Sequence, residues 1–194
     1  MTIIEKTYKH VVPSAREFVK SFQEKYSKSV FPENWNDNPA WTKLIFDIFG
    51  EMGRGFGYKP RKEYLDIDMV WAIRHQDVSA IAVALEHDNG DLNDVIDDEL
   101  QKLLDTKAYL KVLMFYPGMP IISENEVLFP EVVEKIKSAR MTNPEESYLL
   151  ITPVLHKDKD SQPTAIEVFA YSFSPSGKWE DLGSFSIDYK GKAS

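Results

Sequence analysis

The sequence has 194 residues, 43% of them hydrophobic, which is enough apolar material to bury a sizeable core and excludes global disorder. It contains no cysteine, which excludes a disulfide framework, a thiolate zinc site and a cysteine nucleophile, and we expect an intracellular, cytoplasmic protein. The formal net charge of −8 argues against a nonspecific, high-affinity nucleic-acid binder, and no apolar run is long enough to predict a membrane span.

Two helices are predicted in the N-terminal third of the chain. The first covers residues 14–26, where Ser14 can cap the helix and apolar residues recur at helical spacing. A loop rich in Pro, Asn and Asp follows, and Asn38 then precedes Pro39, a pair typical of a helix N-terminus. The second helix runs from there to residue 52 and carries a wide apolar stripe.

Three glycines follow this second helix, at Gly53, Gly55 and Gly57. A dinucleotide-binding loop has a strand before its glycines and a helix after them, whereas here a helix comes first, so the pattern favours a helix end and a turn. The only compact basic cluster of the chain adjoins them and consists of Arg54, Lys59, Arg61 and Lys62. A solvated loop is the ordinary interpretation of this cluster, and contact with substrate phosphates is the alternative.

Residues 64–73 and 79–87 predict two β-strands, because both are rich in β-branched and aromatic residues. The polar connection at residues 74–78 has the length of a hairpin, so we expect the two strands to pair antiparallel. The second strand is apolar on both faces until Glu86, which predicts a central strand of the sheet.

The remaining elements predict a mixed sheet with helices packed on it. Residues 91–104 have helical periodicity with Asp91 as the N-cap, and residues 109–116 form a strand parallel to the preceding one because a helix connects them. A further helix is expected at residues 126–140, with Pro130 near its beginning. The last three strands are expected at residues 148–155, 164–173 and 179–189. The expected fold class is therefore α/β, a mixed β-sheet flanked by helices with a C-terminal antiparallel meander.

Three parts of the chain are expected to pack as one domain: an N-terminal helix and loop at residues 1–38, an α/β core at residues 39–140 and the β-meander at residues 141–194. Charge is uneven along them, since residues 66–105 hold 11 of the 31 acidic residues and 2 of the 23 basic ones. A solvated acidic helix face is the ordinary interpretation of such a block, and a cation site is the alternative.

Asp66 and Asp68 share one face of their predicted strand, as do Glu86 and Asp88, because residues two apart in a strand point the same way. If the hairpin closes around residues 76–77, Asp68 lies opposite Glu86, and a register shifted by one or two residues brings in Asp66 or Asp88. Carboxylates this close repel each other unless a proton or a divalent cation lies between them. Mg²⁺ suits these donors, since it prefers carboxylate and water oxygens.

These acids also have ordinary structural interpretations. A D-x-D pair is common on exposed edge strands, and Glu86 and Asp88 at a strand end can serve only to solubilise the sheet and cap the next helix. His87 points away from both acids, and a hydrogen-bonded core histidine is its commoner role. Lys102 by itself is typical of a solvated lysine on a helix.

The helix at residues 39–52, the segments LDIDMVW and IAVALEHDN, the next helix and the segment LKVLMFY together resemble the core of the PD-(D/E)XK, restriction-endonuclease-like superfamily over residues 39–116. The resemblance implies metal-dependent hydrolysis of phosphodiester bonds in nucleic acid. It also implies that an acid on the second core strand and the Glu of an E-x-K motif on the third bind Mg²⁺ or Mn²⁺. By position these are Asp68 and Glu86, and Glu51 resembles an optional acid of the first helix.

The sequence departs from the family pattern at two positions. Ile67 precedes Asp68 where proline is often found, and Asp88 stands where the family has its lysine. That lysine is thought to polarise the attacking water and stabilise developing negative charge, which an aspartate cannot do. Lys102 on the following helix is the first candidate to replace it, and Lys111 is the second.

Our first hypothesis is therefore a nuclease-type hydrolase that depends on Mg²⁺ or Mn²⁺ and acts on nucleic acid. Asp68 and Glu86 bind the metal, and Lys102 stabilises the transition state. Asp88 and Glu51 support the metal directly or through water. The basic cluster receives substrate phosphates.

The competing hypothesis is a noncatalytic nuclease-like domain that binds a partner protein or nucleic acid through its C-terminal sheet. Phe169, Tyr171 and Phe173 alternate on one face of a predicted strand. Core packing is the usual role of such a stripe, and base stacking or formation of a homodimer is the alternative. Other chemistry is not indicated, because the four histidines form no HExxH spacing and the sequence has no G-x-S-x-G motif.

Overall fold

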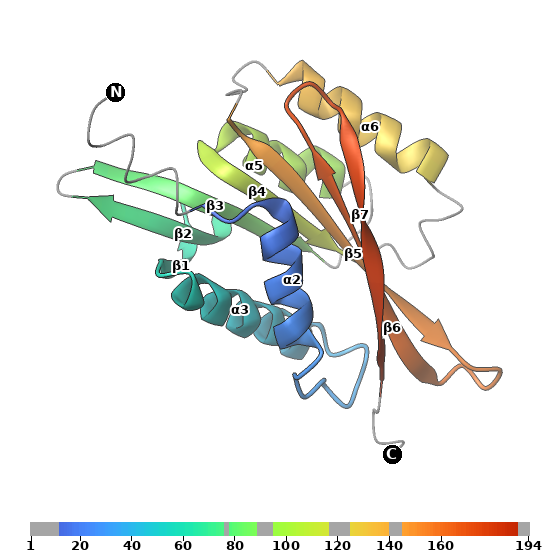
Figure 1. The fold of residues 1–194 in the computed structure, drawn as a ribbon. Coiled ribbons are helices and arrows are strands. Elements are labelled where there is room, and N and C mark those ends of the chain that lie inside the picture. The colour runs from blue at the N-terminus through green and yellow to red at the C-terminus, as the bar shows by residue number, and fades with distance from the viewer. Residues whose placement is uncertain (1–11, 76–77, 89–94, 117–124, 140–144, 190–194) are drawn as a thin grey trace.

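Seven strands form one mixed β-sheet, and their order in the sheet follows their order in the chain (Figure 1). The computed structural model describes residues 12–75, 78–88, 95–116, 125–139 and 145–189. The strands are β1 (Lys59–Tyr64), β2 (Ile67–His75), β3 (Val78–Asp88), β4 (Ala108–Phe115), β5 (Ser147–Lys157), β6 (Pro163–Phe173) and β7 (Trp179–Asp188). The β3/β4 and β4/β5 pairs are parallel, and the other pairs are antiparallel.

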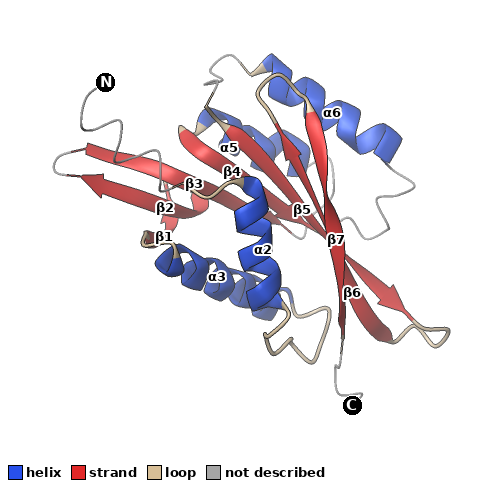
Figure 2. Ribbon diagram, viewed as in Figure 1, coloured by secondary structure: helices blue, strands red, loops and turns tan. Residues whose placement is uncertain are grey.

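Helices cover both faces of this sheet, so the chain is a mixed α/β protein with two hydrophobic cores (Figure 2). The helical elements are α2 (Ala15–Tyr26), α3 (Asn38–Gly55), the short π-helical segment η1 (Val95–Glu99), α5 (Leu100–Asp105) and α6 (Asn125–Ser138). The apolar faces of α2 and α3 pack on one side of the sheet, and those of η1, α5 and α6 pack on the other. Most of both faces of the central strands is therefore covered, which explains the nearly continuous apolar sequence of β3 and β4.

Both N-terminal helices form where the sequence predicts them. Ser14 caps α2, and its backbone N–H donates a hydrogen bond to the side chain of Glu17. The cap of α3 differs from the prediction, because the side chain of Asp37, not that of Asn38, accepts a hydrogen bond of 3.1 Å from the backbone of Ala40. The helix also begins one residue earlier as a result.

The glycines after residue 52 do not end α3 as the sequence predicts. The helix continues to Gly55, and only Gly57, with a φ of +85°, takes the left-handed conformation of a turn. Gly53 is needed for contact: a methyl group on it would lie 2.8 Å from both the Pro60 side chain and the Trp71 indole nitrogen. Helix α3 therefore approaches β1 and β2 through a position that has no side chain.

The strand predicted at residues 64–73 is two strands. β1 ends at Tyr64 and β2 begins at Ile67, and the tight turn between them holds Leu65 and Asp66 at φ values of 55° and 62°. Turns of this kind usually contain Asn-Gly or Asp-Gly, so the Leu-Asp pair gives no sequence signal. Asp66 consequently lies in this turn and not on a strand with Asp68, and the basic residues 59–62 lie on an edge strand, not in a loop.

The other strands agree with the prediction. β2 and β3 form the expected antiparallel hairpin, and β4 follows parallel to β3 after a helical crossover. The three C-terminal strands extend the same sheet, because β5 pairs directly with β4. Pro130 lies inside α6, five residues after its start. The predicted cap Asp91 lies outside the described residues.

No helix in the described part of the chain combines the length and apolar character needed to cross a membrane.

We predict that Gly53→Ala destabilises the protein by about 1–3 kcal/mol, because the added methyl group forces Trp71 or Pro60 to move. The measurement is urea unfolding, and Gly55→Ala is the matched control, since a methyl group added there would have no atom within 4 Å. The control should be neutral or slightly stabilising, because alanine favours the helix. Equal effects of the two substitutions would contradict this account of the contact between α3 and the sheet.

Candidate functional site

Asp68 and Glu86 face each other across the hairpin of β2 and β3. Met69 pairs with Leu85, so the next position along the ladder brings Asp68 opposite Glu86. Both side chains point to the face that carries α5, because each alternates with a neighbour that packs under α2 and α3. The backbone N–H of His87 donates a 2.9 Å hydrogen bond to Asp68 Oδ2, which fixes this carboxyl group against β3.

Helix α5 and the segment before it add a third acid and a lysine. Lys102 Nζ donates hydrogen bonds of 2.8 and 2.9 Å to the two carboxylate oxygens of Glu99. Glu99 also shares a side-chain hydrogen bond with Glu86, and the charge of Lys102 acts on both Glu86 and Asp68. We call these four residues, Asp68, Glu86, Glu99 and Lys102, the acid–lysine cluster.

Glu86 is the buried member of this cluster, with only 1% of the residue exposed. Its Oε1 atom has no hydrogen-bond partner among the residues that the structure describes. Burial raises the pKa of Glu86 well above its ordinary value of 4.5, and the nearby Asp68 and Glu99 raise this pKa further. Burial also raises the pKa of Asp68, opposed by its hydrogen bonds with His87 and Glu86. At neutral pH, Glu86 therefore keeps a proton unless a cation takes its place.

The donors of this cluster fit a magnesium-type ion bound partly by water. Within the described ranges, no three His, Asp or Glu side chains form a complete ligand set. Mg²⁺ does not need one, because proteins often hold it by one or two carboxylates together with waters and substrate phosphates. Asp68 and Glu86 provide two such carboxylates, and Glu86 Oε1 is an oxygen that lacks a partner within the described protein.

Two other acids expected at the site have different surroundings. Asp88 is half-buried at the end of β3, where its charge acts on the His87 ring. Glu51 lies on α3, on the opposite side of the sheet, and its carboxylate accepts a 3.1 Å hydrogen bond from Lys25. The structure therefore does not bring Glu51 to the acid–lysine cluster.

Lys111, the second candidate for the missing lysine, is engaged elsewhere. Its ammonium group is buried and lies 2.9 Å from the Glu146 carboxylate, which also accepts a 3.2 Å hydrogen bond from the Tyr148 hydroxyl. Burial lowers the pKa of Lys111, while Glu146 raises it. Lys111 and Glu146 therefore form a buried ion pair with a structural role. Lys102 is the lysine that lies near Asp68 and Glu86.

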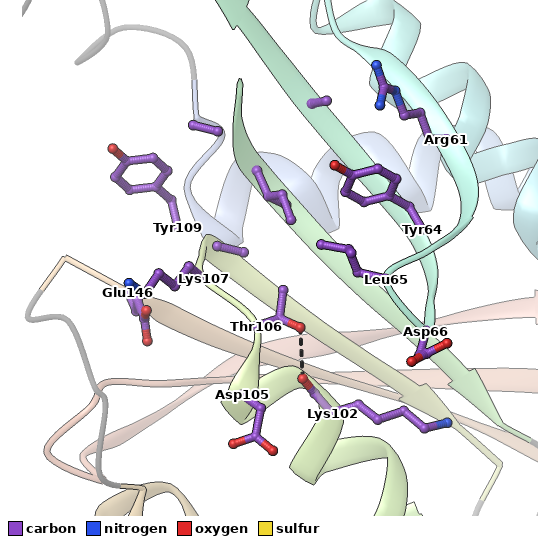
Figure 3. A pocket seen from close by; sticks show the side chains of 14 residues that line it. Arg61, Tyr64, Leu65, Asp66, Lys102, Asp105, Thr106, Lys107, Tyr109 and Glu146 are labelled. Atoms are coloured by element: carbon purple, nitrogen blue, oxygen red, sulfur yellow. Dashed lines mark hydrogen bonds between the residues drawn. The ribbon is translucent and has the colours of Figure 1, made fainter. Parts of the chain in front are cut away.

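The four basic residues proposed for phosphate contact do not form one patch. Arg61 stacks over the Tyr64 ring at 5.3 Å, whereas Lys62 lies 5.1 Å from the ring of Phe46 on α3. Arg54 is exposed at the end of α3, and Lys59 is exposed on β1. Only Arg61 lines the cleft beside the acid–lysine cluster (Figure 3).

His87 points away from the acids, as expected, and packs edge-on against Phe46 and Tyr116. The expected hydrogen bond is not found, because neither ring nitrogen has a partner among the described residues. Burial lowers the pKa of His87 to about 4, so the ring is neutral at physiological pH.

The aromatic stripe of β6 packs into the protein. Tyr171 and Phe173 are buried in the core under α5 and α6, and Phe169 packs against the same core. These side chains therefore have the structural role that such a stripe usually has.

Sequence reasoning missed the cleft itself. It lies between the β1–β2 turn and the beginning of β4, has a volume of about 1070 Å³ and includes Lys102 in its lining. Its existence depends on the turn at Leu65 and Asp66, for which the sequence carries no usual turn signal.

No protein-family model matches this chain, and no curated protein matches it in sequence. The geometry of the site must therefore carry the argument for function.

We predict that Glu86→Gln stabilises the metal-free protein at pH 8 by about 1 kcal/mol or more. Between pH 4.5 and the raised pKa, native Glu86 holds a proton that the unfolded chain has released. The free energy of unfolding therefore falls as the pH rises through this range, and the substitution removes that loss.

The measurement is urea unfolding from pH 4 to 9 with a chelator present, and the advantage of the variant should shrink toward pH 4. Glu51→Gln is the control, because its side chain is 60% exposed, and it should change stability by less than about 0.5 kcal/mol. A parent and a Glu86→Gln variant with the same pH dependence would show that Glu86 is ionised in the native protein without metal.

Proposed function

We propose that this protein hydrolyses phosphodiester bonds in nucleic acid with Mg²⁺ or Mn²⁺ held by Asp68 and Glu86. The observation that carries the proposal is the buried Glu86 carboxyl group, which faces Asp68 and has an oxygen without a partner among the described residues. A buried acid beside two other acids costs stability, and a divalent cation removes that cost.

The order of elements supports the same proposal. Helix α3, the β1–β2–β3 meander, helix α5 and the parallel strand β4 follow one another as in the PD-(D/E)XK core that the sequence resembles. The two acids sit on adjacent strands of that segment, next to the crossover helix. The proposed metal ligands are thus on rigid strands, which suits a catalytic site.

Each acid has a distinct part in holding the metal. Asp68 is oriented by the His87 backbone N–H, and its contact with Glu86 would be exchanged for the ion once Glu86 has lost its proton. Glu86 would release its proton on binding, because the positive charge stabilises the carboxylate. When bound, such an ion acts as a Lewis acid toward the phosphate and makes water more acidic.

Lys102 would stabilise the negative charge that develops on the phosphate. The hydrogen bonds to Glu99 raise the pKa of Lys102, so its ammonium group stays charged at neutral pH and cannot act as a general base. Glu99 holds this ammonium beside the two acids. Asp88, at the position of the family's lysine, carries the wrong charge for this role.

We predict that Mn²⁺ or Mg²⁺ raises the melting temperature of the parent protein and that Asp68→Asn and Glu86→Gln abolish this rise. A ligand that binds only the native state at about 100 times its Kd adds about 2.7 kcal/mol of stability. Asp98→Asn is the control, because Asp98 is an exposed carboxylate on η1. An equal response of all four proteins to metal would overturn the proposed site.

We further predict that Lys102→Met lowers the rate of nucleic-acid cleavage by about 100-fold or more while the metal-induced rise in melting temperature remains. Cleavage is measured on single- and double-stranded DNA and RNA. Lys43→Met is the control, since Lys43 is exposed on α3 and pairs only with Asp47 among the described side chains. Cleavage by Lys102→Met at the parent rate would remove this lysine from the mechanism.

A further inference from the structure

The cleft beside the acid–lysine cluster has two unlike walls and an apolar floor. One wall comes from β1 and its turn and includes Arg61, Tyr64 and Leu65, and the other comes from the beginning of β4 and includes Lys107 and Tyr109. Figure 3 shows the two tyrosines on opposite sides of the cleft. The floor is the sheet surface at Ala72, Ala80 and Ile81.

This lining favours a flat, partly aromatic ligand. Tyr109 is 36% exposed, and the guanidinium of Arg61 lies 5.3 Å from the centre of the Tyr64 ring. Exposed aromatic rings and arginine planes are the surfaces on which nucleobases stack in proteins that bind single strands. The two alanines of the floor leave room above the sheet for such a ring.

Leu65 is an exposed apolar residue at the edge of the cleft. It is 70% exposed, and it has a positive φ of 55°, which a leucine rarely adopts. A large apolar side chain held outward by a strained turn lowers stability, and such features are found where function needs them. Proteins that open stacked bases insert leucine side chains of this kind between them.

The charges of the lining disfavour a rigid duplex. Asp66, Asp105 and Glu146 stand among the cations Arg61, Lys102 and Lys107. Glu146 is already paired with buried Lys111, and the remaining positive and negative charges of the lining nearly cancel. A duplex carries one negative charge per about 1.7 Å and needs a basic surface. An unpaired strand gains part of its affinity from the stacking of its bases on aromatic rings, which does not depend on the charge of the surface.

We propose that this cleft binds unpaired nucleotides of a DNA or RNA strand, with bases stacked on Tyr64 and Tyr109 and Leu65 separating them from a paired region. The proposal deepens the function proposed above and rests on it, because Lys102 joins the cleft to the acid–lysine cluster. A strand lying in the cleft thereby has a phosphate near the acids.

The test is fluorescence anisotropy with labelled oligothymidylate, oligouridylate and a blunt-ended duplex, each measured with a chelator so that no strand is cut. We expect both single strands to bind more tightly than the duplex. Tyr64→Ala and Tyr109→Ala should each weaken single-strand binding about tenfold. Tyr109→Phe should bind as the parent does, because it keeps the ring.

Trp179→Ala is the matched control, since Trp179 is 51% exposed on β7, the strand at the opposite edge of the sheet. It should leave binding unchanged. Duplex binding as tight as single-strand binding, or equal binding by the parent and both alanine variants, would overturn the cleft proposal.

Leu65→Gly separates a functional from a structural role. Glycine adopts a positive φ without strain, so the variant should unfold at a higher urea concentration than the parent. If Leu65 opens base pairs, the same variant should cut single strands at the parent rate and duplex ends more slowly. An equal loss of cleavage rate on single strands and duplex ends, or no loss on either, would exclude the separating role.

The cleft proposal and the proposed function can fail separately. Tyrosine-dependent binding by a parent protein that cuts nothing in Mg²⁺ or Mn²⁺ would support the cleft and contradict the nuclease. Cleavage of nucleic acid that does not depend on the two tyrosines would support the nuclease and contradict the cleft proposal.

Discussion

The antiparallel register of β2 and β3 is the constraint on which the candidate site depends. It brings Asp68 and Glu86 opposite each other on the sheet face that η1 and α5 cover. Two carboxyl groups in such a place cannot both be charged without a compensating cation, so one keeps its proton or an ion binds. The lysine of α5 is held by Glu99 and offsets only part of the negative charge. The site therefore lowers the stability of the metal-free protein.

The two faces of the sheet differ in how closely they are packed. On the face of α2 and α3, aromatic rings pack closely, and Gly53 lets α3 lie directly on Trp71. On the other face, α5 is only six residues long and ends at Asp105. The sheet surface at Ala80 and Ile81 stays half-exposed there, and the cleft lies over it. A well-packed face thus supports an opposite face that is partly open and rich in charge.

Much of the fold follows from local sequence patterns, whereas the site needed tertiary information. Helical periodicity, strand composition and the crossover between β3 and β4 were sufficient to predict the mixed sheet and the meeting of Asp68 with Glu86. The turn at Leu65 and Asp66 escaped prediction because leucine rarely adopts a positive φ and the turn contains no glycine or asparagine. The face on which Glu51 lies and the burial of Lys111 depend on how α3 and β5 pack, which a single sequence pattern does not encode.

The central claim is that Asp68 and Glu86 share one divalent cation. Anomalous diffraction from crystals soaked in Mn²⁺ tests it most directly, because manganese scatters anomalously and prefers the same oxygen ligands as magnesium. Our account predicts a peak bound to one oxygen of each carboxylate, with waters completing the coordination. Contacting carboxyl groups with no peak between them, or a peak only elsewhere on the protein, would contradict it.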